Sequence, residues 1–409
     1  MRDEESCSTL ESRPRKSIPS PSSSSRSTRW LSSAAMSEEN RPTTVAAAVL
    51  TNLETIEATQ VQTPLFPPPP DEVQIKVMAV GICGSDLAYW KRGVAGGFKK
   101  IDFDKLNQGY CGRMGHECAG VVVATGGNVH SIQLGDRVAL EPGIPCSTCS
   151  LCRRGRYNLC RKVRFIGSAV NETPGALIQV FNHPAEFCHK LPDHISMEEG
   201  AMIEPLCVAL QAVHRARITI GQKVLITGAG PIGLLTALAL RTAGASTVVL
   251  TDISRTKLDL AARLGFQSCD AAYGNAQSVF DKLQNISDGH FDACFECSGV
   301  KAGLDLCIQA AESGGVICVV ANHKPEVSIG LQELSRREID IVGVYRYCNL
   351  YPKAISLLAS GSLDVKPLIS DRKFGLHNAN EAFAYFASGE PVKVIINPNP
   401  EICLRCSEV

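Results

Sequence analysis

Two groups of residues in this chain have the types and spacing of metal ligands. In the segment 146–160, Cys146, Cys149 and Cys152 follow one another at C-x-x-C spacing, and Cys160 completes a set of four thiols. Four thiolates suit the closed tetrahedral coordination of a structural zinc ion. Buried cysteines, a disulfide or a nucleic-acid-binding zinc knuckle are the alternatives, and a formal net charge of zero disfavours the knuckle.

The second group consists of Cys83 in "GICGSD" and the pair His116 and Glu117 in "GHECAG". One thiolate, one imidazole and one carboxylate would leave a fourth position open, as a catalytic zinc requires. The local alternative is that the glycines make turns and the polar residues only accompany them. Glu204, in "EGAMIEPL", supplies a further carboxylate for such a site.

A glycine-rich loop predicts a dinucleotide site. Gly228, Gly230 and Gly233 form a GxGxxG pattern between a strand-like run and a helix-like run, and Asp252 ends the next strand-like run "TVVLTD". In this motif the glycines allow a tight turn, close approach of the pyrophosphate and close packing, while the acid binds the ribose. Asp252 therefore favours NAD over NADP, although nearby Lys257 weakens this preference. A glycine-rich turn in another α/β fold is the alternative.

The secondary structure predicted around these residues changes along the chain. Short apolar runs broken by Gly and Pro predict a β-rich part, and later runs of strand, turn and helix predict a parallel sheet. The fold class is therefore α/β. The expected division is a Ser-rich disordered extension at 1–41, a catalytic zinc domain at 42–207 with the cysteine lobe at 143–161, a dinucleotide-binding domain at 208–345, and a return to the catalytic domain at 346–409.

The composition limits the partners and the location. The chain has 409 residues, 41 basic and 41 acidic, which disfavours nucleic acid and anionic membranes as partners. Eighteen cysteines without a signal peptide are read mainly as buried thiols and metal ligands of a cytoplasmic protein. A mitochondrial location is the alternative, because the Ser- and Arg-rich segment 1–41 has a composition typical of a transit peptide. The acidic start "MRDEES" argues against a transit peptide.

Several motifs together resemble the zinc-dependent medium-chain dehydrogenase/reductases, and within them the polyol branch. The motifs are "VGICGSD", "GHECAG", "GDRVALEPG", "CSTCSLCRRGRYNLC", "EEGAMIEPL", "GAGPIG" and "YRYCN". The resemblance covers residues from about 43 to 398. It implies a Rossmann doubly wound parallel sheet, a β-rich catalytic domain like the chaperonin GroES, two zinc ions per chain, NAD, and a homotetramer or dimer.

The resemblance also implies roles for individual residues. Cys83, His116 and Glu117 would hold the catalytic zinc, with Glu204 beside it and Ser85 near the reacting hydroxyl. The residues implied at the substrate are Tyr89, Phe165, Glu204, Arg346 and Tyr347, and those implied at NAD are Gly228, Gly230, Ile232, Gly233, Asp252 and Lys257.

The activity that this implies is reversible oxidation of a polyol such as sorbitol at C2 to the ketose fructose. Zinc would lower the pKa of the substrate hydroxyl, and NAD would accept the hydride. Xylitol, L-arabinitol, threonine or a diol are alternative substrates, and a dehydrogenase fold kept only for structure or binding is the non-enzyme alternative. The segment 96–114 is longer than the family pattern, and Arg113-Met114 departs from it. The pair Cys294/Cys297 is expected in the core, and Cys403/Cys406 is a candidate redox pair.

Overall fold

The structure is a computed structural model that describes residues 44–95, 100–103, 112–167, 173–272, 276–287, 289–324 and 326–400. These residues belong to the compact unit Pro42–Val409. The predicted extension at 1–41, most of the long segment 96–114 and the Cys403/Cys406 pair lie outside the described residues.

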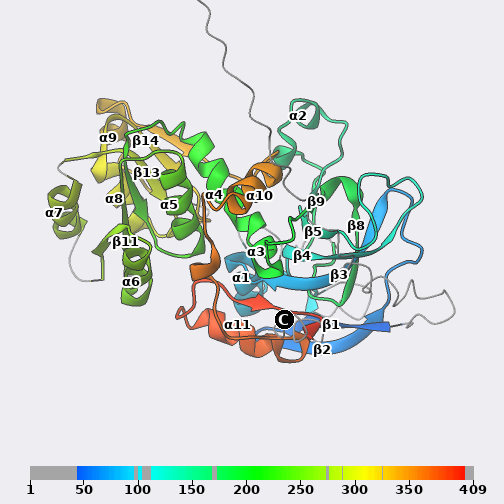
Figure 1. Cartoon of the computed structure of the whole chain (residues 1–409). Helices are drawn as coiled ribbons and strands as arrows, with labels where there is room; N and C mark the ends of the chain where they lie inside the picture. Colours follow the sequence, from blue (N-terminus) through cyan, green and yellow to red (C-terminus); the bar gives the residue numbers. More distant parts are fainter. Residues whose placement is uncertain are drawn as a thin grey trace, which may run out of the picture. The chain divides into compact units, whose positions relative to one another are not determined.

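The first sheet is built mainly from antiparallel strands in the order β16-β3-β4-β5-β9, with β8 also paired to β3 (Figure 1). Its strands are β3 (Glu72–Gly81), β4 (Glu117–Thr125), β5 (Arg137–Leu140), β8 (Val180–Pro184), β9 (Cys188–Lys190) and β16 (Ile395–Ile396). A hairpin of β1 (Thr44–Asn52) and β2 (Thr55–Gln62) lies beside it, and the late helix α11 (Ala379–Ala387) packs against β2. The late strand β16 is only two residues long, but it pairs with β3 and so returns the chain to this sheet.

The second sheet is fully parallel, in the order β12-β11-β10-β13-β14-β15. Its strands are β10 (Lys223–Thr227), β11 (Thr247–Asp252), β12 (Gln267–Asp270), β13 (Phe291–Glu296), β14 (Ala311–Val319) and β15 (Asp340–Gly343). The strand order reverses between β10 and β13, and ligands of such sheets bind in the crevice at this reversal. The parallel sheet with its reversal of strand order, beside a separate antiparallel sheet, confirms the α/β fold class expected from the sequence.

Helices cover both faces of the parallel sheet because its strands are apolar on both sides. On β10, Val224 and Ile226 pack into one core with α4 (Ile203–Arg215), α5 (Pro231–Thr242), α6 (Arg255–Arg263) and α10 (Tyr351–Ala359). Leu225 packs into the opposite core with α7 (Ala276–Ser287), α8 (Lys301–Ala310) and α9 (Leu331–Arg336). Cys294 is fully buried in that second core, as expected, whereas Cys297 is only half-buried, at the edge of the first core.

The cysteine lobe projects from the first sheet between the two short strands β6 (Gly143–Ile144) and β7 (Arg164–Phe165). It contains α2 (Ser150–Arg153) and the 3-10 turn η3 (Tyr157–Leu159), and α2 stands apart from the sheets in Figure 1.

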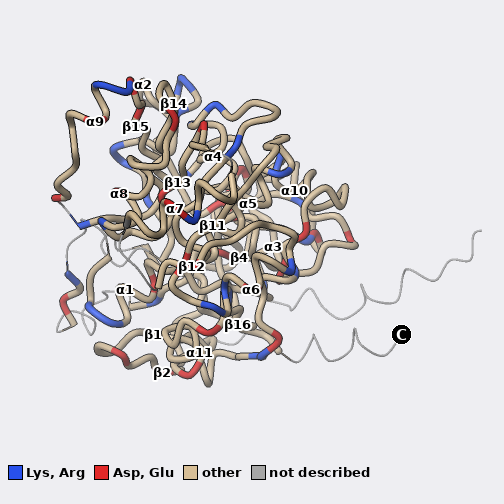
Figure 2. Tube along the Cα trace, turned by 90° about the vertical axis from the view of Figure 1, so that its left-hand side faces the viewer, with Lys and Arg blue, Asp and Glu red and all other residues tan. Residues whose placement is uncertain are grey.

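Charges of both signs are interspersed along the described chain (Figure 2). Within the described ranges, no helix is both long and apolar enough to cross a membrane.

Candidate active site

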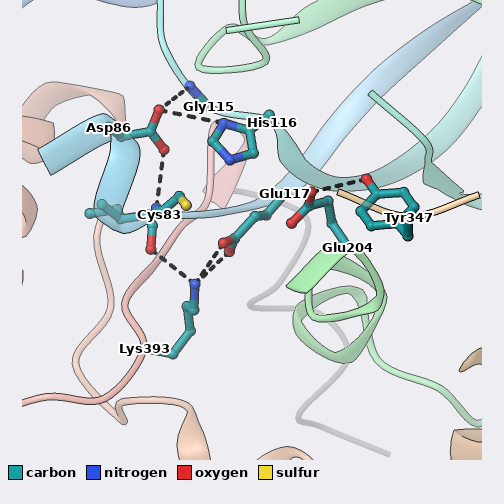
Figure 3. Close-up of polar contacts among 9 residues, drawn as sticks. Cys83, Asp86, Gly115, His116, Glu117, Glu204, Tyr347 and Lys393 are labelled. Atoms are coloured by element: carbon teal, nitrogen blue, oxygen red, sulfur yellow. Dashed lines mark hydrogen bonds and ion pairs between the residues drawn. The ribbon is translucent and has the colours of Figure 1, made fainter. Parts of the chain in front are cut away.

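The pairing of β3 with β4 brings the two glycine-flanked motifs together. Glu117, the first residue of β4, is directly opposite Gly81, the last residue of β3, and Cys83 follows two residues later. A Cβ atom at position 81 would lie 2.1 Å from Glu117 Oε2, so the close approach requires glycine there. The ligand atoms of Cys83, His116 and Glu117 all lie within 4.8 Å of one another (Figure 3).

Asp86 fixes the orientation of this cluster. It is the third residue of α1 (Gly84–Arg92), and its carboxylate accepts a hydrogen bond from the backbone N–H of Cys83 at 3.1 Å. Its other oxygen lies 3.5 Å from Nδ1 of His116, which leaves Nε2 as the nitrogen available to a metal. Burial lowers the pKa of His116, but Asp86 and Cys83 outweigh it and raise the pKa well above the ordinary value.

Lys393 is the cation that balances the cluster. Its Nζ atom donates to both Glu117 oxygens, at 2.8 and 2.7 Å, and to the carbonyl oxygen of Ile82 at 3.0 Å (Figure 3). Both charged side chains are almost fully buried. Burial lowers the pKa of Lys393, but the negative charge of Glu117 outweighs it, so the pKa is raised overall.

Glu204 approaches the cluster from α4. It is buried, and the hydroxyl of Tyr347 donates a hydrogen bond to its Oε1 atom at 2.9 Å. Burial raises the pKa of Glu204 to about 7, with a smaller opposing effect from His116. A carboxyl group with such a pKa exchanges a proton near neutral pH, which suits general acid–base chemistry.

A cavity of about 510 Å³ connects the ligand cluster with the crevice of the parallel sheet. Most of the residues expected at the substrate line it, together with the three ligands and Ile232: they are Ser85, Tyr89, Phe165, Glu204 and Arg346. Tyr347 lies elsewhere, since it borders a small separate cavity and uses its hydroxyl on Glu204. The structure thus gives Tyr347 a contact with the acid rather than with the large cavity.

The glycine loop between β10 and α5 opens onto a second cavity, of about 410 Å³. Gly228, Gly230, Asp252 and Lys257 line it. Gly228 has a φ of +96°, and a Cβ atom at Gly233 would lie 1.9 Å from the carbonyl oxygen of Gly228. The Asp252 carboxylate accepts hydrogen bonds from the N–H groups of Ala229 and Ser254, at 2.7 and 2.8 Å, which holds it at the end of β11. The loop therefore has the open cradle and the acid that an adenine dinucleotide requires.

The four cysteines of the lobe are also brought together, with their sulfur atoms within 4.8 Å of one another. Backbone N–H groups of Cys146 and Lys162 point at the sulfur of Cys160, at 3.5 and 3.4 Å. Hydrogen bonds from the backbone and from Thr148 lower the pKa of Cys146 to about 5, so a thiolate forms readily there. This donor set fits zinc. The open Cys83/His116/Glu117 set fits zinc as well, and the buried Lys393 balances the charge of its carboxylate.

Comparison with known proteins agrees with this architecture. The alcohol dehydrogenase GroES-like domain model matches residues 69–193, and the zinc-binding dehydrogenase model matches residues 231–360. Sorbitol dehydrogenase from Bos taurus is 41% identical over 340 residues, which cover 82% of this chain and 92% of the bovine protein. L-idonate 5-dehydrogenase from Vitis vinifera is 41% identical over 335 residues, covering 80% and 88% of the two chains.

Among solved structures, 2R,3R-butanediol dehydrogenase from Bacillus subtilis is similar with a TM-score of 0.77 at 30% identity, covering 87% of this chain and all of that chain (100%). L-idonate 5-dehydrogenase from Escherichia coli gives a TM-score of 0.76 at 26% identity, covering 87% and 98%. The chain therefore belongs to the zinc-binding dehydrogenases of the medium-chain type, and it is a zinc- and nicotinamide-dependent oxidoreductase.

Sequence reasoning missed two residues of the site. Asp86 carries a local signal, since Cys83 and Asp86 have the spacing of a capping box at the start of a helix. Lys393 is an isolated charge in the apolar run "PVKVIINP", which indicates a buried ion pair but does not identify its partner.

Proposed function

We propose that this enzyme oxidises a polyol such as sorbitol at C2 to the ketose fructose, reversibly and with NAD. The observation that carries the proposal is the joint presence of the open three-ligand cluster and the half-buried Arg346 guanidinium on the wall of one cavity. The guanidinium atom Nη1 is buried and has no hydrogen-bond partner among the described residues, so it is available to a substrate hydroxyl. The similarity to sorbitol dehydrogenases supports the same substrate class.

The same cation favours a second candidate. A polyhydroxy acid such as L-idonate would place a carboxylate against Arg346, and an Arg–carboxylate pair is stronger than a neutral contact. The grape relative and the Escherichia coli structure both carry the name L-idonate 5-dehydrogenase. Xylitol, L-arabinitol and other secondary alcohols are further candidate substrates.

The roles of the residues follow from their contacts. When bound, zinc would act as a Lewis acid on the substrate hydroxyl and NAD would accept the hydride. Cys83, His116 and Glu117 would hold the metal, and Asp86 keeps the His116 ring in place for it. Glu204 would hold or release a proton at its carboxylate, because its pKa of about 7 allows both states near neutral pH. We assign Ser85 and Tyr89 to the substrate side of the cavity.

The preference for NAD is assigned to Asp252. Its carboxylate lines the dinucleotide cavity and would repel a 2′-phosphate while accepting hydrogen bonds from ribose hydroxyls. Lys257 lines the same cavity and reduces this repulsion, so we expect weak residual use of NADP.

The test is a substrate panel followed by NADH or NADPH absorbance. Sorbitol, xylitol, L-arabinitol, L-idonate, L-threonine and butane-2,3-diol are each offered with either cofactor, with and without a chelator. We expect the highest kcat/KM with a six-carbon polyol and NAD, and loss of turnover with chelator. Turnover that survives in Cys83→Ser or His116→Ala would contradict the assignment of the metal site, whereas preference for L-idonate would select the second candidate.

Assembly, domain division and location are also proposals. We expect a homotetramer, or a dimer, by light scattering of the purified protein, and a cytoplasmic location by fractionation. The proposed catalytic part comprises 42–207 and 346–409, and the dinucleotide part comprises 208–345. The boundary between 207 and 208 falls inside α4, so this helix would belong to both parts.

A further inference from the structure

The cysteine lobe is hydrogen-bonded to a distant segment at residues 345–349. The side-chain amide of Asn158 donates to the carbonyl oxygen of Tyr345 at 2.9 Å. In the other direction, Asn349 donates from its backbone N–H to the Tyr157 hydroxyl at 2.7 Å, and from its side chain to the carbonyl oxygen of Gly155 at 3.1 Å. The lobe therefore holds both ends of a short segment whose middle is Arg346 and Tyr347.

This segment has a backbone that needs support from outside. It follows β15 of the parallel sheet and precedes α10. Arg346 has a φ of +52°, in the left-handed region that disfavours most residues other than glycine, and Asn349 has a φ of +56°, which asparagine tolerates better. Such conformations persist where surrounding contacts determine them. The hydrogen bonds from the lobe are contacts of this kind.

Tyr157 links the lobe to the first sheet as well. Its hydroxyl donates to Glu141 Oε1 at 2.7 Å, and the other oxygen of this buried carboxylate lies 3.1 Å from Nε2 of His189. Glu141 comes directly after β5. One phenol oxygen thus joins the first sheet, the lobe and the segment that carries Arg346.

The base of the lobe fixes the side chain of Arg346. Phe165 belongs to β7, the strand that closes the lobe, and the Arg346 guanidinium carbon lies 3.8 Å from the centre of its ring. The same ring packs beside His116, with 5.3 Å between ring centres. The lobe therefore constrains Arg346 in two ways. Residues of η3 hold the backbone on either side of it, at Tyr345 and Asn349, and Phe165 of β7 contacts its guanidinium.

We propose that the cysteine lobe, through Tyr157 and Asn158, positions Arg346 for the part of the substrate that lies away from the reacting carbon. Tyr157 and Asn158 are positioning residues in this scheme, since neither lines the large cavity. The four-cysteine site then sets substrate affinity in addition to stability. This inference rests on the proposed function only for the identity of the substrate.

The experiment compares Tyr157→Phe and Asn158→Ala with the control Arg154→Ala. Arg154 is an exposed residue of the same lobe whose side chain donates only within the lobe, to the carbonyl oxygen of Ser150. For each full-length holoenzyme, kcat and KM are measured for sorbitol and for butane-2,3-diol, which lacks the distal hydroxyl groups. Zinc content and hydrogen exchange of the Asn349 amide are measured on the same samples.

We expect KM for sorbitol to rise about tenfold in both variants, equivalent to about 1.4 kcal/mol, with little change in kcat. KM for butane-2,3-diol and the zinc content should stay at wild-type values, and Arg154→Ala should match the wild type throughout. The Asn349 amide should exchange faster in Tyr157→Phe, because its acceptor has been removed. Equal rises in KM for both substrates, or unchanged exchange at Asn349, would overturn the proposal.

The two proposals fail in different ways. If the wild-type enzyme oxidises no polyol, the proposed function is wrong. Hydrogen exchange of the Asn349 amide then still tests whether the lobe constrains residues 345–349. If sorbitol is oxidised but its KM is unaffected in both variants, the function stands and the positioning role is wrong.

Discussion

Lys393 and Glu117 form a buried ion pair in which one ammonium group contacts both carboxylate oxygens, at 2.8 and 2.7 Å. Removing one member of a buried pair leaves an uncompensated charge and costs about 3 to 5 kcal/mol. A metal ion at the Cys83/His116/Glu117 cluster would supply a compensating charge. We therefore expect Lys393→Met to destabilise the metal-free protein by about 3 kcal/mol or more, and the zinc-loaded protein by less.

The measurement for Lys393 is thermal or denaturant unfolding with zinc and with chelator. Lys393→Arg keeps the charge and serves as the matched control, so it should lie much nearer the wild type. An equal loss of stability with and without zinc would show that the metal does not share the carboxylate with Lys393.

Asp86 should govern how tightly the catalytic metal is held. Asp86→Asn keeps the shape but weakens the hold on Nδ1 of His116, and loss of such an outer partner lowers metal affinity about tenfold to 100-fold. Competition with a chromophoric chelator measures the affinity. The zinc ion of the cysteine lobe is the internal control, and its release should be unchanged. A mutant that loses both ions together would point to general unfolding instead.

Cys152 should be necessary for one of two zinc ions per chain. Its sulfur lies 4.0 Å from that of Cys146 and 3.4 Å from that of Cys149, so it is central to the four-thiol set. Elemental analysis of Cys152→Ala should give one zinc per chain instead of two, with a lower unfolding temperature. Cys188→Ala, a buried thiol outside both clusters, should retain both ions. An unchanged metal content in Cys152→Ala would refute the structural site.

Glu204 should make the metal-free protein less stable as pH rises. Its pKa is raised from 4.5 to about 7 in the folded chain. The folded state therefore binds the proton more tightly than the unfolded state. This contribution is complete below pH 4.5 and is lost as the pH rises to about 7. We expect the unfolding free energy of the wild type to fall relative to that of Glu204→Gln over this range.

Tyr347→Phe provides the comparison for Glu204. The Tyr347 hydroxyl lowers the pKa of Glu204 by donating to its carboxylate, so its removal should extend the loss of stability to higher pH. Urea unfolding at several pH values after removal of zinc measures both effects. Parallel pH profiles for the wild type and Glu204→Gln would contradict the assigned pKa.

The sequence predicted the parts of the site that are set by local spacing. The four cysteines lie within one short segment, and Gly228, Gly230 and Gly233 lie within one turn, so their types and intervals describe their geometry. Cys83 and His116 are further apart in the sequence. Cys83 follows β3 and His116 precedes β4, and the pairing of these two strands brings the residues together.

The parts that the sequence did not predict depend on packing between distant segments. Lys393 is 276 positions from Glu117, and Tyr347 is 143 positions from Glu204. Interactions over such separations have no periodicity or spacing that marks them. The motif "YRYCN" indicated substrate contacts for Arg346 and Tyr347 together, but only Arg346 lines the large cavity, whereas Tyr347 borders the small one and donates to Glu204.

The return of the chain through β16 has a consequence for how the enzyme acquires its metal. Proteins are synthesised from the N-terminus, so Cys83, His116 and Glu117 leave the ribosome well before Lys393 and its strand. A nascent chain can present the three ligands, but the carboxylate among them has no buried partner and β3 lacks its edge neighbour. The balanced site exists only after the segment that carries Lys393 has been synthesised, 276 positions after Glu117. Maturation of the catalytic centre is thereby coupled to synthesis of the distant segment that carries Lys393, whereas the four ligands of the cysteine lobe lie within residues 146–160 and need no such distant partner.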